Sequence, residues 1–356
     1  MSNIEGLEEI DLNITNKCNI GCSHCLFAAG PEQGDDLSLA EIEGVLRGGR
    51  RLGAKEVHIS GGEPTLRKGL TQVLRMADNQ GYFVRLQTNL LAFQPEMLPL
   101  IAETTDEVLT SLDGLENSHD LIRRLGSFQK TVDSIDYLLN ADIRVVVVTA
   151  VQRKNYRDIL KLVEFLSDKG ISAHFLFSVT PLGRASQEDV VSPTEWESLV
   201  EELYEAYKVK NLSTDVVCEL HHLRGNESFT FNGAECRLYT RNHAIVLPDG
   251  RVYPCSMFIS TERSLGNIRE MSFEEIWNDS PVWNFYDDRI NDPQCDGCKL
   301  LALCKGGCPG YSYLLTGDTT KHDPRCEPGM YPVCPSWKLN LKKATLSCST
   351  WRVMKR

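Results

Sequence analysis

Residues 144–179 have the sequence RVVVVTAVQRKNYRDILKLVEFLSDKGISAHFLFSV and contain one strand–helix–strand unit. Arg144–Ala150 and Ala173–Val179 are short runs of β-branched and aromatic residues, which are typical of buried strands. Between them, Tyr156–Asp168 places Ile, Leu and Val at the three- and four-residue spacing of an amphipathic helix. Because a helical crossover returns the chain to the same end of the sheet, the two strands are predicted to be parallel.

The same alternation extends toward the N-terminus. Four further strands are predicted at Glu9–Ile14, Glu56–Ser60, Phe83–Thr88 and Glu107–Leu112, and four further helices at Leu39–Leu52, Gly69–Asn79, Glu96–Ala102 and Ser127–Asn140. Six strand–helix units in a row indicate an α/β fold with a parallel sheet. Six units are too few for a closed eight-stranded barrel, so we expect an open, partial (β/α)6 parallel barrel. Its chemistry should lie on loops at the C-terminal ends of the strands.

Composition excludes several classes of function. The chain of 356 residues has 38 Lys and Arg against 49 Asp and Glu, a formal charge of −11. This acidic balance argues against a nucleic-acid partner, because phosphate binding needs clustered cations. The N-terminus has no basic stretch followed by an apolar one, and no run of 18 apolar residues occurs, so neither a secretory signal nor a membrane span is expected. A cytoplasmic protein is predicted.

The character of the sequence changes twice after the sixth strand. An acidic amphipathic helix is expected from Pro193 to Lys210, and from Cys236 onward Gly, Pro, Cys and Trp dominate. We therefore predict a barrel domain at residues 1–210, a bridging segment at 211–235, and a cysteine-rich domain with a basic tail at 236–356.

The 13 cysteines form two groups. Three lie between Cys18 and Cys25, none in the next 192 residues, and ten from Cys218 onward. Disulfides are rare in cytosolic proteins, where closely spaced cysteines are more often metal ligands or redox groups. Two separate metal-binding regions are predicted.

Cys18, Cys22 and Cys25 directly follow the first strand, on a loop at the C-terminal edge of the strands where the chemistry is expected. Three thiolates can hold three irons of a 4Fe–4S cluster and leave the fourth iron open to another ligand. The alternative is a zinc site closed by His24 as fourth ligand.

The Cys-x3-Cys-x2-Cys triplet resembles the signature of the radical S-adenosylmethionine (SAM) superfamily. That resemblance implies that the amino and carboxylate groups of SAM chelate the open iron. His24 departs from the family, which usually has an aromatic residue there; the change affects packing against adenine more than cluster binding.

Other rim segments carry the same resemblance. Ser60-Gly61-Gly62-Glu63-Pro64 resembles the segment that holds the SAM amino group, with Gly61, Gly62 and Glu63 as cofactor-binding residues. By resemblance, Ser111 meets the ribose or carboxylate of SAM, and Arg123 pairs with its carboxylate. The alternative for Arg123 is a solvated charge on a helix. The segment 180–184 resembles the adenine-contact turn, where we expect backbone rather than side-chain contacts.

The C-terminal cysteines resemble those of the SPASM extension of the radical SAM family. The matching residues are Cys236, Cys255, Cys295, Cys298, Cys304, Cys308 and Cys326. The resemblance implies two auxiliary 4Fe–4S clusters, the first held by Cys236, Cys255 and Cys308, the second by Cys295, Cys298, Cys304 and Cys326. Either Cys334 completes the first cluster, or that iron is open to substrate or another side chain. The alternative is a pair of zinc knuckles.

Two features of this half do not depend on the resemblance. Residues 243–255 are predicted to form a hairpin that turns at Pro248-Asp249-Gly250. Cys218 and Cys348 are left over as expected packing residues, although Cys218 is also a candidate hydrogen donor to a substrate.

The resemblance implies an enzyme that reductively cleaves SAM to a 5′-deoxyadenosyl radical, which abstracts hydrogen from a substrate and gives net oxidation. Maturation of a ribosomally made peptide or protein is the main expectation, with a peptide or small-molecule substrate and a reductant such as flavodoxin or ferredoxin as partners. The first strand begins near Glu9, so we expect no fused leader-binding domain, and a peptide would then need a separate leader-binding protein. The basic stretch 337–356 is a candidate site for an acidic leader, and the alternative is a solvated tail. The alternatives are oxidative tailoring of a tetrapyrrole such as a haem side chain, or a non-catalytic electron-transfer protein.

Overall fold

The computed structural model describes residues 6–32, 36–210, 212–218, 221–224, 228–231, 236–287, 290–298, 301 and 305–326. The strands are β1 (Glu9–Asn13), β2 (Glu56–Ser60), β3 (Phe83–Thr88), β4 (Glu107–Ser111), β5 (Val145–Val151), β6 (Ala173–Ser178), β7 (Asp215–Cys218), β8 (His221–Arg224), β9 (Ser228–Phe231), β10 (His243–Val246), β11 (Arg251–Tyr253) and β12 (Gly266–Asn267). The helices are α1 (Leu39–Leu52), α2 (Leu70–Asn79), α3 (Leu98–Thr104), α4 (Glu116–Ile122), α5 (Ser127–Leu139), α6 (Ile159–Asp168), α7 (Pro193–Val209), α8 (Arg237–Thr240), α9 (Phe273–Asp279), α10 (Trp283–Tyr286) and α12 (Pro309–Thr316).

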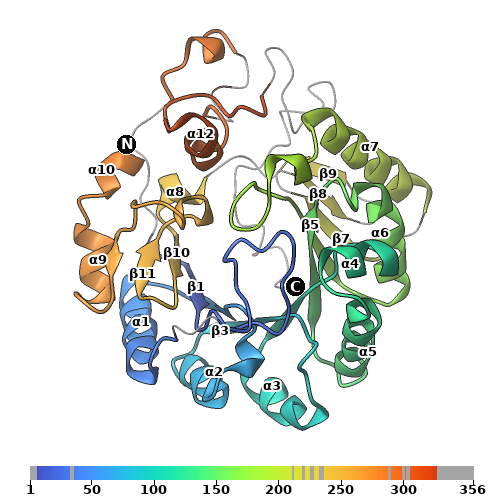
Figure 1. Ribbon diagram of the computed structural model, residues 1–356, viewed down its shortest axis with the longest axis horizontal. Helices are drawn as coiled ribbons and strands as arrows, with labels where there is room; N and C mark the ends of the chain where they lie inside the picture. Colours follow the sequence, from blue (N-terminus) through green and yellow to red (C-terminus); the bar gives the residue numbers. More distant parts are fainter. Residues whose placement is uncertain are drawn as a thin grey trace.

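The strands form one sheet of 12 in the order β12-β11-β10-β1-β2-β3-β4-β5-β6-β7-β8-β9. The run from β10 to β7 is parallel, and the strands beyond it at each end are antiparallel. The parallel strands curve into an arc with α1 to α7 around its outside (Figure 1). The arc continues into antiparallel strands at each end instead of closing, so the expected open, partial parallel barrel is confirmed.

All six predicted barrel strands form, and two further strands join the parallel run in pairings that were not predicted. β7 lies in the predicted bridging segment and pairs with β6, with Asp215 opposite Ala173. β10 comes from the cysteine-rich half and pairs with β1, with His243 opposite Glu9. Each of these strands is four residues long, which gives too little periodicity to reveal a distant partner. The sheet therefore runs across both predicted domain boundaries, and the boundaries stay a prediction.

The helices cover the outer face of the barrel. Because successive strand residues point to opposite faces, every second strand residue packs against these helices. Ile10 and Leu12 of β1 pack in the large core with α1 and α2 residues such as Val45 and Val73, all at most 1% exposed. α1 begins and ends at the predicted residues; a capping box at Ser38 starts it. The shortest predicted helix, Glu96–Ala102, begins and ends later in the structure. A 3-10 turn comes first, and α3 then runs from Leu98 to Thr104.

The inner face of the barrel has two chemically different halves. On β1 to β4 it carries charged side chains, joined by ion pairs such as Arg85 with Glu107 (2.7 Å). On β4 to β7 it is apolar and includes Val146 and Phe175. Phe177 of β6 stacks on Phe175 (centroids 6.2 Å apart) and stays 44% exposed. Solvent therefore reaches the inner face on the side of β6.

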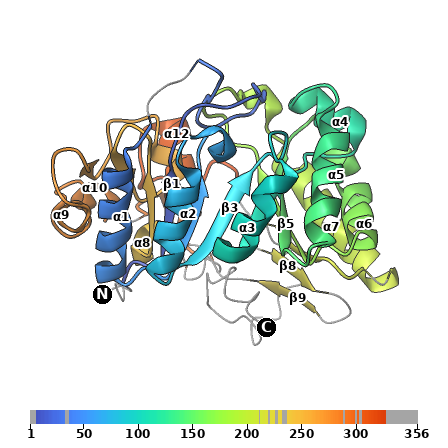
Figure 2. The ribbon, with the colours of Figure 1, turned by 90° about the horizontal axis from the view of Figure 1, so that it is seen from below.

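The cysteine-rich half packs against the barrel beside α1. The predicted hairpin is confirmed as β10 and β11, with Val246 opposite Val252. α9 lies against α1, where Arg51 pairs with Glu274 (2.9 Å). Figure 2 shows α9, α10 and α1 together at one side of the molecule and α4 to α7 at the other. No described helix is long and apolar enough to cross a membrane.

Candidate active site

The loop that follows β1, residues 14–32, lies within the arc of strands (Figure 1). The end of β2 holds this loop through its backbone. The Gly62 amide donates to the carbonyl of Thr15, and the Glu63 amide to the carbonyl of Lys17, each at 2.7 Å. These two hydrogen bonds fix the loop at the C-terminal end of the barrel.

The paired glycines are needed because the two backbones approach so closely. A Cβ at Gly62 would lie 2.3 Å from the carbonyl oxygen of Lys17, well inside van der Waals contact. Gly61 has φ +150, and a Cβ there would lie 2.5 Å from the carbonyl oxygen of Thr15. The pair therefore shapes the cysteine loop, besides any approach to a ligand.

Cys18, Cys22 and Cys25 lie together on this loop and none is in a disulfide. Cys18 and Cys22 are each 7% exposed, whereas Cys25 is half-buried. Burial, followed by the nearby Glu63 carboxylate and the other two thiolates, raises the pKa of Cys18 to about 11. Three thiols packed this closely would repel each other as thiolates, and a positively charged iron centre relieves that repulsion. The donor set therefore fits a cluster held by three cysteines.

Arg123 supplies positive charge next to the cysteines. Its Nε donates to Asp113 Oδ2 at 2.6 Å, and its Nη1 donates to Cys22 Sγ at 3.7 Å. Burial alone would raise the pKa of Asp113, but Arg123, His24 and His119 outweigh it and lower the pKa to about 2. The Arg123 side chain is 11% exposed, so the alternative of a solvated helix charge is wrong.

His24 has a polar side chain beside each of its ring nitrogens. Its Nε2 lies 3.6 Å from Asp113 Oδ2, and its Nδ1 lies 3.4 Å from Nε2 of Gln152. Burial lowers the pKa of His24, so the ring is neutral at pH 7. With both nitrogens facing these partners, His24 is not placed as a fourth metal ligand, and the zinc alternative for the loop loses its closing residue.

Glu63 is fully buried and forms hydrogen bonds that connect neighbouring segments at the C-terminal ends of the strands. Its Oε1 accepts from the hydroxyl groups of Thr65 (2.6 Å) and Thr88 (2.7 Å), and its Oε2 from the Asn89 amide (2.7 Å). The side chain of Asn89 donates in turn to Asn19 Oδ1 at 2.7 Å. Glu63 thus joins the ends of β2 and β3 and, through Asn89, the cysteine loop.

The predicted residue Ser111 ends β4, two residues before Asp113. It is half-buried and pairs in register with Val148, whose side chain lies on the inner face. The structure thus places Ser111 on the inner side of the rim, near the Asp113–Arg123 pair.

Arg184 is a site residue that the sequence did not reveal. Its Nε donates to the carbonyl of Cys22 (2.7 Å) and its Nη1 to the carbonyl of Ala29 (2.9 Å). Next to it, Gly183 has φ +63, and a Cβ there would lie 2.3 Å from the carbonyl oxygen of Cys25. The expectation that backbone atoms of this turn contact adenine stays a prediction, and the Arg184 guanidinium holds the cysteine loop in place.

The C-terminal cysteines gather at two places. Cys255 precedes the 3-10 turn Ser256–Phe258, and Cys308 caps α12 by accepting from the Tyr311 amide at 3.3 Å. Burial, followed by the negative charge of neighbouring Cys308, raises the pKa of Cys255 to about 12. Cys236, at the start of α8, and Cys255 each pack against the edge of the large core.

The second group lies where residues 290–298 meet residues 318–326. Asp292 Oδ2 lies 2.9 Å from His322 Nδ1, and the two segments also share a backbone hydrogen bond. Cys295 and Cys298 are on the first segment and Cys326 on the second. Cys304, Cys334 and Cys348 lie outside the described residues, as does the side chain of Cys218.

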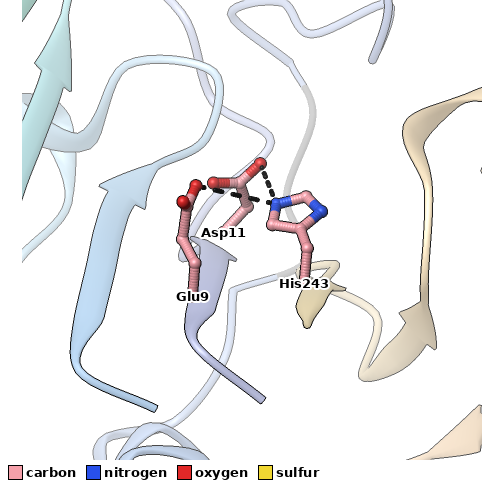
Figure 3. Close-up of side chains that lie close together, drawn as sticks. All are labelled: Glu9, Asp11 and His243. Atoms are coloured by element: carbon pink, nitrogen blue, oxygen red, sulfur yellow. Dashed lines mark ion pairs between the residues drawn. The ribbon is translucent and has the colours of Figure 1, made fainter. Parts of the chain in front are cut away.

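A separate polar cluster lies near the start of the barrel strands. Figure 3 shows Glu9, Asp11 and His243 converging, with His243 Nε2 3.1 Å from Asp11 Oδ2. Arg237 lies 2.9 Å from Glu9, and His58 lies within 3.3 Å of both carboxylates. Because the acids already have these partners, the cluster acts as an ion network that ties β10, β1 and β2 together.

The chain matches two family descriptions. Residues 12–166 match the Radical SAM superfamily, and residues 236–299 match SPASM, an iron-sulfur cluster-binding domain. The protein is therefore a radical SAM enzyme. More narrowly, it belongs to the SPASM-type radical SAM enzymes, whose cofactors are SAM, a 4Fe–4S cluster and auxiliary iron–sulfur clusters.

Similar proteins match over most of the chain. It is 28% identical over 336 residues to the AdoMet-dependent heme synthase of Methanosarcina barkeri, covering 88% of this chain and 94% of that protein. It is 26% identical over 324 residues to the mycofactocin maturase MftC of Mycolicibacterium smegmatis, covering 89% and 81%. The fold is similar to Streptococcus suis SuiB bound to its precursor peptide SuiA, with TM-score 0.78, 17% identity, and 91% and 77% coverage.

Proposed function

We propose that this enzyme uses the 5′-deoxyadenosyl radical to oxidise a ribosomally made peptide or protein. The observation that carries the proposal is the buried three-thiol loop beside the Arg123–Asp113 pair, joined in one sheet to a second cysteine field. Its similarity to a mycofactocin maturase, and its fold likeness to an enzyme seen with a precursor peptide, support a peptide substrate.

Cys18, Cys22 and Cys25 are the proposed ligands of the cluster that binds SAM. That cluster, when bound, supplies the electron that cleaves a carbon–sulfur bond of SAM to give methionine and the radical. The burial of Cys18 and Cys22 keeps water away from the reacting atoms, and Arg184 holds the loop in place.

The rim geometry supports the proposed SAM-binding roles. Arg123 is the proposed partner of the SAM carboxylate, and its hydrogen bonds to Asp113 and to the thiol of Cys22 support this role. The backbone at Gly61 and Gly62 and the half-buried Ser111 line the same rim. Both carboxylate oxygens of Glu63 accept hydrogen bonds from Thr65, Thr88 or Asn89, so we propose that Glu63 mainly positions this rim. Its negative charge also favours the binding of the SAM ammonium group nearby.

The C-terminal cysteines are the proposed ligands of two auxiliary clusters. Cys236, Cys255 and Cys308 belong to the first; the closeness of Cys255 to Cys308 supports this grouping. Cys295, Cys298, Cys304 and Cys326 belong to the second, with Cys334 as candidate to complete the first. When bound, such clusters would accept the electron left on the substrate after hydrogen abstraction, and the net reaction would then be an oxidation. A flavodoxin or ferredoxin is the proposed reductant.

A second candidate function is oxidative tailoring of a tetrapyrrole. It is favoured by the match to a heme synthase over 94% of that protein's length. The stacked pair Phe175 and Phe177 on the inner face offers an aromatic surface for a macrocycle, and it offers one equally to an aromatic peptide side chain.

The test uses anaerobically reconstituted protein, SAM and dithionite, with 5′-deoxyadenosine measured by chromatography. Candidate precursor peptides and tetrapyrroles are added separately, and their mass change is measured. A peptide that loses hydrogen in step with 5′-deoxyadenosine formation supports the main proposal. If only tetrapyrroles are converted and no peptide is, the main proposal is contradicted and the tetrapyrrole function is supported.

A further inference from the structure

The turn between α4 and α5 carries an exposed apolar pair. Leu121 is 70% exposed and Leu125 is 89% exposed, although most large apolar side chains of the described chain are buried. Arg124, between them, is also exposed. We name Leu121, Arg124 and Leu125 the α4–α5 patch.

The backbone of this turn lies directly on the cysteine loop. The Ser23 amide donates to the carbonyl of Ile122 at 3.0 Å, and Arg124 Nη1 donates to the carbonyl of Asn19 at 3.4 Å. Arg123, in the same turn, reaches the thiol of Cys22. Only the turn itself therefore separates the patch from the cysteine loop.

Local charge differs from that of the whole protein. The chain has a formal charge of −11, yet the exposed residue between the two leucines is the cation Arg124. The neighbouring Asp120 accepts from the amides of Gly126 and Phe128, so its charge is partly offset by the start of α5. The patch is thus locally cationic with an apolar centre, which suits a small, transient contact with an acidic protein.

We propose that the α4–α5 patch is the docking surface for an acidic one-electron donor protein of the flavodoxin or ferredoxin class. This inference rests on the proposed assignment of Cys18, Cys22 and Cys25. The donor is oxidised by one electron, and that electron is consumed when one carbon–sulfur bond of SAM breaks into methionine and the 5′-deoxyadenosyl radical.

The location favours a donor over the substrate as occupant. A substrate must reach the radical inside the arc of strands, whereas α4 and α5 lie on its outer side (Figures 1 and 2). An electron needs only a short path to the cysteine loop, which the turn at residues 122–124 provides by direct contact.

The test measures how fast a reduced donor bleaches the cluster held by the N-terminal cysteines. Flavodoxin hydroquinone is mixed anaerobically with the loaded enzyme in a stopped-flow spectrometer, and the auxiliary signal is subtracted with a Cys18→Ala, Cys22→Ala, Cys25→Ala protein. The test variant is Leu121→Glu with Leu125→Glu, which leaves the contacts of Arg124 intact. The matched control is Val209→Glu with Leu315→Glu, which makes the same charge change at two exposed apolar positions on α7 and α12.

The patch variant should lower the second-order rate constant with flavodoxin about tenfold at low salt, and less at high salt. Reduction by dithionite should stay within about twofold, and the control variant should match the native protein. A patch variant as fast as native with flavodoxin overturns the proposal. So does a loss seen only in substrate turnover with dithionite, which would make the patch a substrate surface. Normal cluster reduction without any 5′-deoxyadenosine would instead count against the proposed function.

Discussion

Exchanging Gly62 for alanine should displace the cysteine loop, whereas the same exchange at Gly21 should not. The new Cβ at position 62 would lie 2.3 Å from the Lys17 carbonyl oxygen. Ordinary contact needs about 3.5 Å, so the loop must move by about 1 Å. Overpacking of this kind costs about 1–3 kcal/mol. The two hydrogen bonds from Gly62 and Glu63 add about 1 kcal/mol each, so the local cost is about 3–5 kcal/mol.

Gly21 is the control because it lies between Cys18 and Cys22 yet a Cβ there meets no described atom within 4 Å. After anaerobic reconstitution, Gly62→Ala should lose about four irons per chain, the content of one cluster, and should retain the auxiliary iron. Its 5′-deoxyadenosine formation should fall at least about tenfold, while Gly21→Ala stays within about twofold of native. Full iron and normal SAM cleavage in Gly62→Ala would refute the argument that this close approach positions the loop.

Three further predictions concern other parts of the molecule. Arg123→Ala should weaken SAM binding at least about tenfold in calorimetric titration, because it removes the buried cation proposed to pair with the SAM carboxylate and deprives Asp113 of its guanidinium partner; unchanged affinity would exclude the assigned contact. Cys255→Ala and Cys308→Ala should remove the same auxiliary signal in electron paramagnetic resonance, and loss of two different signals would refute their grouping. Burial lowers the pKa of His174 to about 3, so its stabilising effect is full above pH 6.5 and lost as the pH falls toward 3. From pH 7 to 5 the free energy of unfolding should drop by about 2 kcal/mol from this group. A His174→Gln protein whose urea midpoint keeps the full pH dependence would contradict this.

The six barrel strands were predictable because each is a compact β-branched or aromatic run with an amphipathic helix after it. The pairing of β10 with β1 was not, because its partner lies far along the chain and each strand is too short to show a pattern. The predicted position of the site at the C-terminal ends of the strands was nevertheless right. The cysteine loop follows β1 and contacts the Gly61-Gly62 segment at the end of β2.

Within the site, sequence reasoning found residue types but not their partners. The cysteine triplet is visible from spacing alone, whereas the burial of Arg123 against Asp113 depends on the turn after α4. Arg184, which follows β6, donates to backbone carbonyls of the cysteine loop. A contact between a side chain and a distant backbone cannot be predicted from the spacing of residues. The engagement of Glu63 by neighbouring strands is likewise a tertiary effect.

The central claim is that SAM is cleaved at a cluster held by Cys18, Cys22 and Cys25 alone. It is tested most directly by comparing 5′-deoxyadenosine formation and iron content in the native protein and in the triple alanine variant of these cysteines, both reconstituted anaerobically with SAM and dithionite. The account predicts that the variant loses all SAM cleavage and about four irons while it keeps its auxiliary clusters. Cleavage that persists in the variant, or a native protein that never cleaves SAM when fully loaded, would contradict it.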